Sequence, residues 1–176
     1  MAVVFLFFYL KYVTIKIMRK RFVSKSLEDT KKIAQAFVEK LLKTSGKTGG
    51  KAVVILLQGN LGSGKTTFVK AVAEILGIKK NITSPTFVLE KVYRMPRVAL
   101  AKWGNPYFTS LVHIDAYRLS GTKDMELLDW GNIVDNPKNL VFVEWPEMVP
   151  GVFPENTPKI ELEFIDENTR VLTFNL

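Results

Sequence analysis

One segment constrains the fold of this chain more than any other, and it reads Gly59-Asn60-Leu61-Gly62-Ser63-Gly64-Lys65-Thr66-Thr67. It fits the pattern G-x-x-x-x-G-K-[ST], with an apolar run at residues 53–57 before it and a helix-forming run at residues 68–76 after it. Glycines let the backbone turn tightly, so successive N–H groups can approach phosphate oxygens, and a helix that begins near Lys65 directs its partial positive charge at the same anion. The sequence therefore predicts a strand, a phosphate-binding loop and a helix in succession.

The side chains of this loop have separate expected roles. Lys65 adds a full positive charge aimed at the β and γ phosphates, and the Thr66 hydroxyl is placed to bind Mg²⁺. The other positions contribute mainly backbone N–H groups, which hold the phosphate oxygens. The predicted cofactor-binding residues are Asn60, Leu61, Gly62, Ser63, Gly64, Lys65, Thr66 and Thr67.

The composition is that of a globular protein, and it excludes several kinds of chemistry. A chain of 176 residues, 47% of them apolar, has room for one domain with a substantial core. The absence of cysteine excludes disulfides, thiolate catalysis and cysteine-based zinc sites, and it agrees with a reducing cytoplasm. Because His113 is the single histidine, a histidine-rich metal centre is excluded as well.

Positive charge is concentrated in the N-terminal third. Residues 1–51 hold 12 Lys and Arg residues against 3 Asp and Glu residues, whereas the remainder holds 13 against 14. Such a basic segment can meet RNA, an acidic protein or a membrane surface, and it can equally be a solvated face without a partner.

The first residues differ in character from the rest. Residues 1–10 are apolar and aromatic, but Lys11 and the run Arg19-Lys20-Arg21 leave the stretch short of the ~20 apolar residues that a membrane-spanning helix needs. A signal peptide carries its positive charges before its apolar part, and here they follow it. We therefore expect a cytoplasmic protein without a membrane span, in which residues 1–20 are an appendage and residues 21–176 form one nucleotide-binding domain. A membrane-surface anchor, or an over-extended start ahead of Met18, is the alternative for the first residues.

The remaining pattern predicts an α/β domain with a mixed central sheet flanked by helices. Ser26 is placed to cap a helix whose apolar stripe runs to Leu42. Further strands are expected at residues 87–93, 111–115 and 139–144, a short helix at 124–130, and an antiparallel hairpin from 160–164 and 170–175. Residues 94–109 lack periodicity and form a long connection, a feature that is usually functional or disordered.

Two of the predicted strands end on a carboxylate, Asp115 in one and Glu144 in the other. In nucleotide-binding α/β sheets the ligand lies off the carboxyl ends of the strands, where acids can reach Mg²⁺ or its waters. Both are candidates for the Walker B role, and the sequence leaves open which of them binds the metal directly. Trp145 either contacts the nucleotide or a partner, or packs in the core. His113 lies inside a strand and is expected to be structural rather than catalytic.

The sequence favours ATP over GTP. A guanine-binding protein would need an [NT]-K-x-D segment late in the chain, and the nearest stretch, Thr122-Lys123-Asp124-Met125, lacks the final Asp. The Asp115 segment does not continue as D-x-x-G, because Arg118 stands at the glycine position. A stand-alone small-molecule kinase is the alternative, although the arginines are scattered instead of gathered in a lid over the phosphates.

Four motifs together resemble one family, the TsaE (YjeE-type) P-loop ATPases of bacteria. They are the loop at residues 59–69, Ser84-Pro85-Thr86-Phe87, His113-Ile114-Asp115-Ala116-Tyr117-Arg118-Leu119 and Glu144-Trp145-Pro146-Glu147. Their order and approximate spacing are those of the family, and the resemblance runs from about Phe22 to Val171. The basic, apolar N-terminus and the long 94–109 segment depart from the family pattern.

The resemblance implies a small P-loop α/β domain whose mixed sheet is closed by late antiparallel strands. It also implies that this protein is the ATPase component for making threonylcarbamoyladenosine (t6A) in tRNA, acting with a TsaB–TsaD pair that ATP hydrolysis resets between rounds. Contact with tRNA would be indirect, or would be made by the basic N-terminal third. The implied cofactors are ATP and Mg²⁺.

The resemblance also assigns roles to single residues. Lys65 and the loop amides would hold phosphates, and Thr66 with Glu144 would hold Mg²⁺. Asp115 would act near the metal or the attacking water, and Thr86 would lie close to the γ-phosphate as a switch-like element. Because no arginine in the chain has a clear claim to stabilise the transferring phosphoryl group, we expect slow hydrolysis without a partner. In a non-enzymatic alternative, bound nucleotide only sets the shape of an interaction module.

Overall fold

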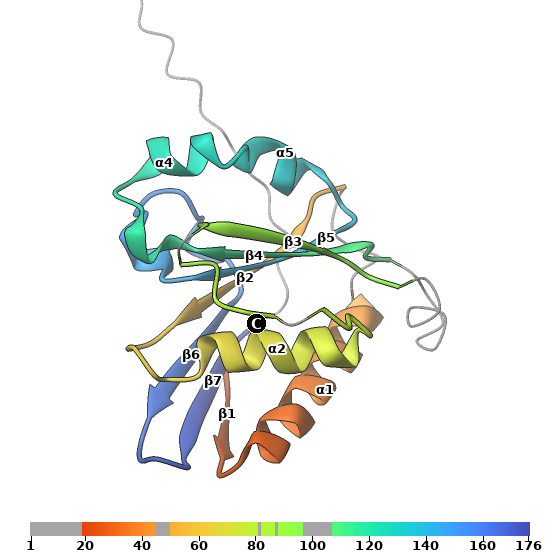
Figure 1. The fold of residues 1–176 in the computed structure, drawn as a ribbon, viewed down its shortest axis with the longest axis vertical. Helices are drawn as coiled ribbons and strands as arrows, with labels where there is room; N and C mark the ends of the chain where they lie inside the picture. The colour runs from red at the N-terminus through yellow and green to blue at the C-terminus, as the bar shows by residue number, and fades with distance from the viewer. Residues whose placement is uncertain (1–18, 45–49, 81, 87, 97–106) are drawn as a thin grey trace, which may run out of the picture.

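The structure is a computed structural model, and it describes residues 19–44, 50–80, 82–86, 88–96 and 107–176. Its strands are β1 (Arg19–Ser24), β2 (Val53–Gln58), β3 (Glu90–Arg94), β4 (Ser110–Asp115), β5 (Asn139–Glu144), β6 (Lys159–Phe164) and β7 (Arg170–Asn175). Its α-helices are α1 (Leu27–Thr44), α2 (Lys65–Ile75), α4 (Thr122–Leu127) and α5 (Trp130–Asp135), with the 3₁₀ turns η2 (Ala116–Arg118) and η3 (Pro146–Met148). The predicted α/β class with a mixed central sheet is confirmed (Figure 1).

The seven strands form one sheet in the order β1-β7-β6-β2-β5-β4-β3. Strand β2 is parallel to both of its neighbours, β5 and β6, and β4 is parallel to β5. The pairs β1–β7, β6–β7 and β3–β4 are antiparallel. The predicted C-terminal hairpin is therefore confirmed as β6–β7. The central strands β2 and β5 are buried on both faces, as expected from their continuous apolar runs.

Helices cover the sheet from both sides. Helices α1 and α2 lie on one face, and α4 and α5 lie on the other, over the half that contains β4 and β5 (Figure 1). Alternate residues of β2 divide between the two layers, since Ile55 faces α1 and α2 whereas Val54 faces the opposite side. The α1–α2 layer is built around a cluster of aromatic rings from Phe37, Phe68, Phe142 and Phe174.

Strand β1 was not predicted, and because of it the folded domain begins at Arg19 and not at residue 21. It pairs in register with β7, from Arg19 opposite Asn175 to Ser24 opposite Arg170. Arg19 and Lys20 therefore belong to the sheet and not to the appendage that was expected at residues 1–20. The exposed charges of this edge strand conceal the alternation by which strands are recognised. Residues 1–18 lie outside the described residues, and no helix among the described ones is long and apolar enough to cross a bilayer.

Two other boundaries differ from the prediction. The strand expected at 87–93 is β3, which begins at Glu90, because the N–H groups of Val88 and Leu89 donate to the Pro85 carbonyl in a turn. Phe87 lies outside the described residues, as do residues 97–106 of the long connection. In place of the single helix expected at 124–130 there are two, α4 and α5. Leu128 and Asp129 lie between them, and Asp129 has a left-handed conformation (φ 57°).

Candidate nucleotide-binding site

The predicted phosphate-binding loop connects β2 to α2. Strand β2 ends at Gln58, and α2 begins at Lys65, with Gly64 in a left-handed conformation (φ 98°) as its N-cap. Gly59 and Gly62 also have positive φ values, of 148° and 78°. Asn60, Leu61 and Gly62 form the exposed tip of the loop, Ser63 and Lys65 are buried, and Gly64, Thr66 and Thr67 are half-buried. The Ser63 hydroxyl has no hydrogen-bond partner among the described residues.

The first glycine of the loop is required by close packing. A Cβ atom at Gly59 would lie 2.1 Å from the carbonyl oxygen of Leu162 in β6. That is far inside van der Waals contact, and the obstacle is backbone, so it cannot swing away as a flexible side chain would. The loop therefore rests directly on the antiparallel half of the sheet.

Lys65 is held by the loop itself. Its Nζ donates to the carbonyl oxygens of Gly59 at 2.6 Å and Asn60 at 3.1 Å, and it lies 3.7 Å from the centroid of the Trp145 ring. Burial lowers the pKa of Lys65, although the nearby carboxylates, Glu144 foremost, act in the opposite direction. The ammonium group is thus desolvated, and no carboxylate of the described residues lies within ion-pair distance of it. This arrangement is suited to receive an anion.

The two strand-end acids lie side by side, because Asp115 of β4 is opposite Glu144 of β5. Glu144 is the acid that contacts the loop: its Oε1 accepts a hydrogen bond from Thr66 Oγ1 at 2.8 Å. The same oxygen lies 2.7 Å from His113 Nε2. Glu144 is 3% exposed and His113 is 0% exposed, so this contact is shielded from water.

Asp115 has a different set of partners. Its Oδ2 accepts hydrogen bonds from Ser84 Oγ at 3.0 Å and from Thr86 Oγ1 at 2.5 Å, and its Oδ1 accepts one from the Tyr117 N–H. The structure therefore brings Thr86 to the same place as the predicted acids. Asp115 ties the segment that carries Thr86 to the end of β4.

The oxygen donors at this place suit Mg²⁺ better than a softer metal. Thr66, Asp115 and Glu144 provide hydroxyl and carboxylate oxygens only. Among the described residues no group of three or more His, Asp or Glu side chains could hold a metal ion by itself. A few oxygen donors that need phosphate and water to complete the shell are the usual protein contribution to an Mg²⁺–nucleotide site.

Trp145 lies at the rim of the site and not in the core. It is half-buried, has a left-handed backbone (φ 57°) directly after Glu144, and its ring centroid lies 5.1 Å from that of Tyr117. Tyr117 is exposed. A bulky residue seldom adopts positive φ unless its surroundings impose it, and such strain is common at functional sites.

A hollow of about 430 Å³ opens between the loop and these side chains. Its lining includes Lys65 and Thr66 from the loop, and it is completed by Ser84, Thr86, Asp115, Tyr117, Glu144 and Trp145. Every residue predicted to act on the γ-phosphate or the metal therefore borders one cavity.

A second hollow, of about 170 Å³, lies on the other side of the loop. It is bordered by loop residues 62–64 and Thr67, by the start of α1 and by the β6–β7 turn with Arg170. Arg170 Nε donates to the Gly62 carbonyl at 3.2 Å, and its guanidinium carbon lies 4.4 Å from the centroid of the Phe164 ring. Sequence reasoning missed this arginine, because 108 residues separate it from Gly62 and only the sheet brings them together.

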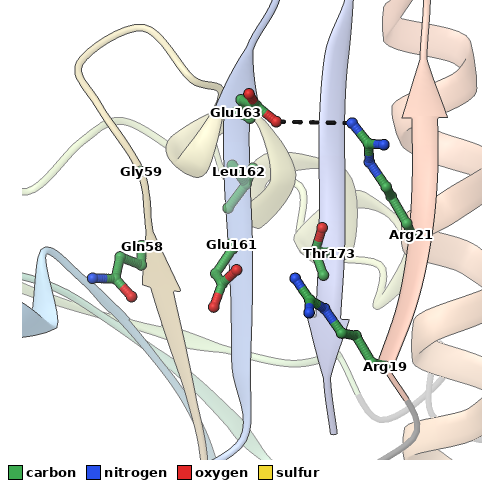
Figure 2. A pocket seen from close by; sticks show the side chains of 8 residues that line it. All are labelled: Arg19, Arg21, Gln58, Gly59, Glu161, Leu162, Glu163 and Thr173. Carbon is green, nitrogen blue, oxygen red and sulfur yellow. Dashed lines mark ion pairs between the residues drawn. The ribbon is translucent and has the colours of Figure 1, made fainter.

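A third hollow, of about 620 Å³, opens on the sheet face that α4 and α5 leave bare. Figure 2 shows arginines of β1 on one side of it and glutamates of β6 on the other, with Thr173 of β7 between them. Arg21 Nη2 lies 4.0 Å from Glu163 Oε2. Gly59 at the start of the loop borders this hollow as well, but none of the predicted catalytic residues does.

Comparison with known proteins places the chain in a family. A family model described as threonylcarbamoyl adenosine biosynthesis protein TsaE matches residues 24–172. The tRNA threonylcarbamoyladenosine biosynthesis protein TsaE of Treponema pallidum is 35% identical over 153 residues, which is 87% of this chain and 98% of that protein. The protein of the same name from Bacillus subtilis is 32% identical over 148 residues, 84% of this chain and 79% of that protein.

A solved structure agrees with the fold. The crystal structure of Bacillus subtilis YdiB superimposes with a TM-score of 0.62 at 24% sequence identity, over 91% of this chain and 86% of that one. The family model and the two TsaE relatives confirm the resemblance found in the four motifs. This chain belongs to the TsaE family of threonylcarbamoyl adenosine biosynthesis proteins.

Proposed function

We propose that this protein binds ATP with Mg²⁺ at the loop between β2 and α2 and hydrolyses it as part of t6A synthesis in tRNA. The observation that carries the proposal is the contact between Thr66 and Glu144, because it joins the loop hydroxyl to an acid at the end of the neighbouring strand. A G-K-[ST] loop next to a strand-end carboxylate is the arrangement by which P-loop proteins hold Mg²⁺ and phosphate.

The two hollows beside the loop suggest how ATP would lie. The γ-phosphate would occupy the hollow that contains Thr86, Asp115 and Glu144, since the acids and the switch-like threonine border it. The nucleoside part of the bound ATP would lie on the other side of the loop. It would extend past Thr67 toward the hollow at the start of α1 and the β6–β7 turn. There the Arg170 guanidinium would contribute positive charge beside the phosphates.

Each residue of the site would then have one task. Lys65 would leave the carbonyls of Gly59 and Asn60 and donate to the β and γ phosphates, which are stronger acceptors. Thr66 donates a hydrogen bond from its hydroxyl to Glu144, so the lone pairs of the hydroxyl oxygen remain available to a metal. Mg²⁺, when bound, would neutralise charge on the β and γ phosphates. Asp115, released from Thr86, would orient the attacking water.

We further propose that hydrolysis is slow until a partner of the TsaB–TsaD type binds. None of the described residues that border the hollow around Thr66 and Glu144 is an arginine, and Arg170 borders the hollow on the opposite side of the loop. A cation supplied from outside can be worth about 10³–10⁵ in the rate of phosphoryl transfer. The exposed Leu61 and Tyr117 beside the site offer apolar surface for such a partner.

Contact with tRNA is proposed to be indirect. The arginines of β1 lie beside Glu161 and Glu163, which offset their charge (Figure 2). A surface of mixed sign attracts the phosphate backbone less than a continuous basic face does.

Reconstitution of t6A synthesis from purified components tests the proposal. Synthesis should require this chain and fail with Lys65→Ala, while Glu155→Gln, an exposed change far from the loop in sequence, should leave it intact. Synthesis supported in full by Lys65→Ala would refute the assignment of the loop. Product analysis separates the alternatives: a kinase would produce a phosphorylated acceptor instead of free phosphate, and a non-enzymatic module would still support t6A formation with Glu144→Gln.

A further inference from the structure

The only histidine of the chain lies where it can act on the proposed metal site. His113 is in β4, opposite Phe142 of β5, and Asp115 two residues later is opposite Glu144. Side chains two residues apart in a strand point to the same face of the sheet, so His113, Asp115 and Glu144 all face the side that α2 covers. His113 is completely buried there.

The hydrogen bonds of His113 define its chemical form. Its Nε2 lies 2.7 Å from Glu144 Oε1, whereas its buried Nδ1 has no hydrogen-bond partner among the described residues. Glu144 Oε1 also accepts a hydrogen bond from Thr66 Oγ1. In the contact with His113 this oxygen is again the acceptor, so the hydrogen lies on Nε2. The geometry therefore makes His113 the donor, with its Nε2–H directed at Glu144.

A purely structural role explains this histidine poorly. Leu111 and Phe142, its neighbours on the same face, are fully buried apolar residues. An apolar side chain at position 113 would fill the same space without leaving a ring nitrogen unsatisfied. Within the described ranges, Glu144 is the one hydrogen-bond partner of the ring, which points to a role that depends on that acid.

Both hydrogen bonds that the described part of the chain makes to the Glu144 carboxylate fall on one oxygen. Thr66 Oγ1 and His113 Nε2 donate to Oε1 from the loop and from β4. Two donors from separate elements fix the carboxylate in one orientation. The other oxygen, Oε2, is then available to the coordination shell of a bound cation.

We propose that His113 is a positioning residue for Mg²⁺–nucleotide binding: its Nε2–H holds Glu144 Oε1 against Thr66, so that the carboxylate is oriented before the metal arrives. The proposal rests on the proposed function, since it assumes that Glu144 serves a metal. Partners that orient a metal ligand in this way are typically worth about 10- to 100-fold in metal affinity.

The first test concerns the free protein and needs no activity. Because the chain holds a single histidine, a long-range proton–nitrogen NMR spectrum of ¹⁵N-labelled protein reports His113 alone. The expected result is a hydrogen on Nε2, with a hydrogen-bonded imidazole proton whose signal changes in Glu144→Ala. An Nδ1–H tautomer, or an imidazole signal that is the same in both proteins, would overturn the proposal.

The second test separates positioning from packing. ADP binding is measured by calorimetry as a function of Mg²⁺ concentration for wild type, His113→Leu and His113→Gln. His113→Leu should raise the Mg²⁺ concentration needed for half-maximal binding by about 10- to 100-fold, whereas His113→Gln, which keeps an N–H donor, should recover most of the effect. Equal Mg²⁺ dependence in all three proteins would overturn the proposal.

A matched control is the neighbouring core position. Phe142→Leu disturbs the packing opposite His113 but leaves the donor to Glu144, so it should lower thermal stability without shifting the Mg²⁺ dependence. A shift as large as that of His113→Leu would identify the effect as packing and refute positioning. If wild-type protein bound no ADP, the proposed function would fail, and the NMR result would still report on the His113–Glu144 contact.

Discussion

At the scale of single residues, two charged groups of this protein are stabilised less by their surroundings than they would be by water. Lys65 is nearly buried, and desolvation lowers its pKa despite the neighbouring carboxylates. Burial raises the pKa of Glu90 at the start of β3, and the Asp129 carboxylate raises it further. For Lys65, the proposed phosphate ligand would offset the cost of burying the ammonium group. Glu90 borders none of the three hollows described above, so its burial should appear as a cost to stability.

Glu90→Gln should therefore stabilise the protein at neutral pH. The pKa of Glu90 in the folded protein lies above its pKa of about 4.5 in the unfolded chain, so the folded state binds the proton more tightly. The free energy of unfolding therefore falls as the pH rises above about 4.5. Removing the charge should raise the free energy of unfolding at pH 7, and the gain should shrink toward zero near pH 4. Urea titrations at both pH values measure the difference. As a control, Glu155→Gln at an exposed position should change the free energy of unfolding by less than about 0.5 kcal/mol at either pH. A Glu90→Gln protein that is no more stable than wild type at pH 7 would contradict the expectation.

At the scale of elements, the loop depends on the strand beneath it and on the segment beside it. Gly59 lies against the backbone of β6, and the segment around Thr86 is tied to the end of β4 through Asp115. Local sequence makes the loop possible, but these contacts hold it in place. Each can be tested without nucleotide.

Gly59→Ala should destabilise the free protein much more than Gly62→Ala. Both positions have positive φ, which costs a non-glycine residue about 1–2 kcal/mol, but only at Gly59 would the added Cβ meet backbone, at 2.1 Å from Leu162 O. At Gly62 nothing lies within 4 Å of it. We expect a loss of about 3 kcal/mol or more for Gly59→Ala against about 1 kcal/mol for Gly62→Ala, measured by chemical unfolding. Equal losses would show that the approach of β6 is not a constraint.

Asp115→Ala should release the segment that carries Thr86. It removes the acceptor of the hydrogen bonds from Ser84 and Thr86, and hydrogen bonds to charged groups contribute about 1.5–3 kcal/mol each. Amide hydrogen exchange at Val88 and Leu89, whose N–H groups donate to the Pro85 carbonyl, should accelerate about tenfold or more. Ser84→Ala, which removes only one of the two donors, should have a smaller effect. Unchanged exchange in Asp115→Ala would mean that the turn is held by its own backbone bonds.

At the scale of the whole molecule, the sheet order decides which residues meet. Because β4 and β5 are adjacent and parallel, their acids lie together beside the loop that follows β2. Because β6 and β7 follow on the other side of β2, Arg170 reaches the opposite flank of the same loop. The hollow proposed for the γ-phosphate has no arginine among the residues of the described ranges that border it.

A partner should therefore raise the rate of ATP hydrolysis. We expect at least a tenfold increase in turnover when a cognate TsaB–TsaD pair is added, which is below the factor of about 10³–10⁵ that an external cation can supply. Phosphate release measured with and without the pair gives the ratio. Thr86→Ala should lose most of the increase if ordering of the switch-like segment contributes to it. A rate that the partner leaves unchanged would show that this chain completes its own site.

The sequence by itself determined the position of the glycine-rich loop, the class of fold and the family. Glycines at fixed spacing, Lys65 and Thr66 act through local geometry, so a pattern of adjacent residues suffices to recognise them. It also predicted Asp115, Glu144 and Thr86 as site residues, because acids at strand ends and the motifs around them are local features too, and the three residues border one hollow. It missed β1, whose exposed charges conceal its alternation.

Only the tertiary structure decided how these residues are paired. Strand order and register decide four contacts: Glu144 with Thr66, Asp115 with Thr86, His113 with Glu144, and Arg170 with Gly62. These partners are separated by 29 to 108 positions in the chain. Their meeting is set by the burial of both faces of one sheet, a property of the whole core that no local pattern contains.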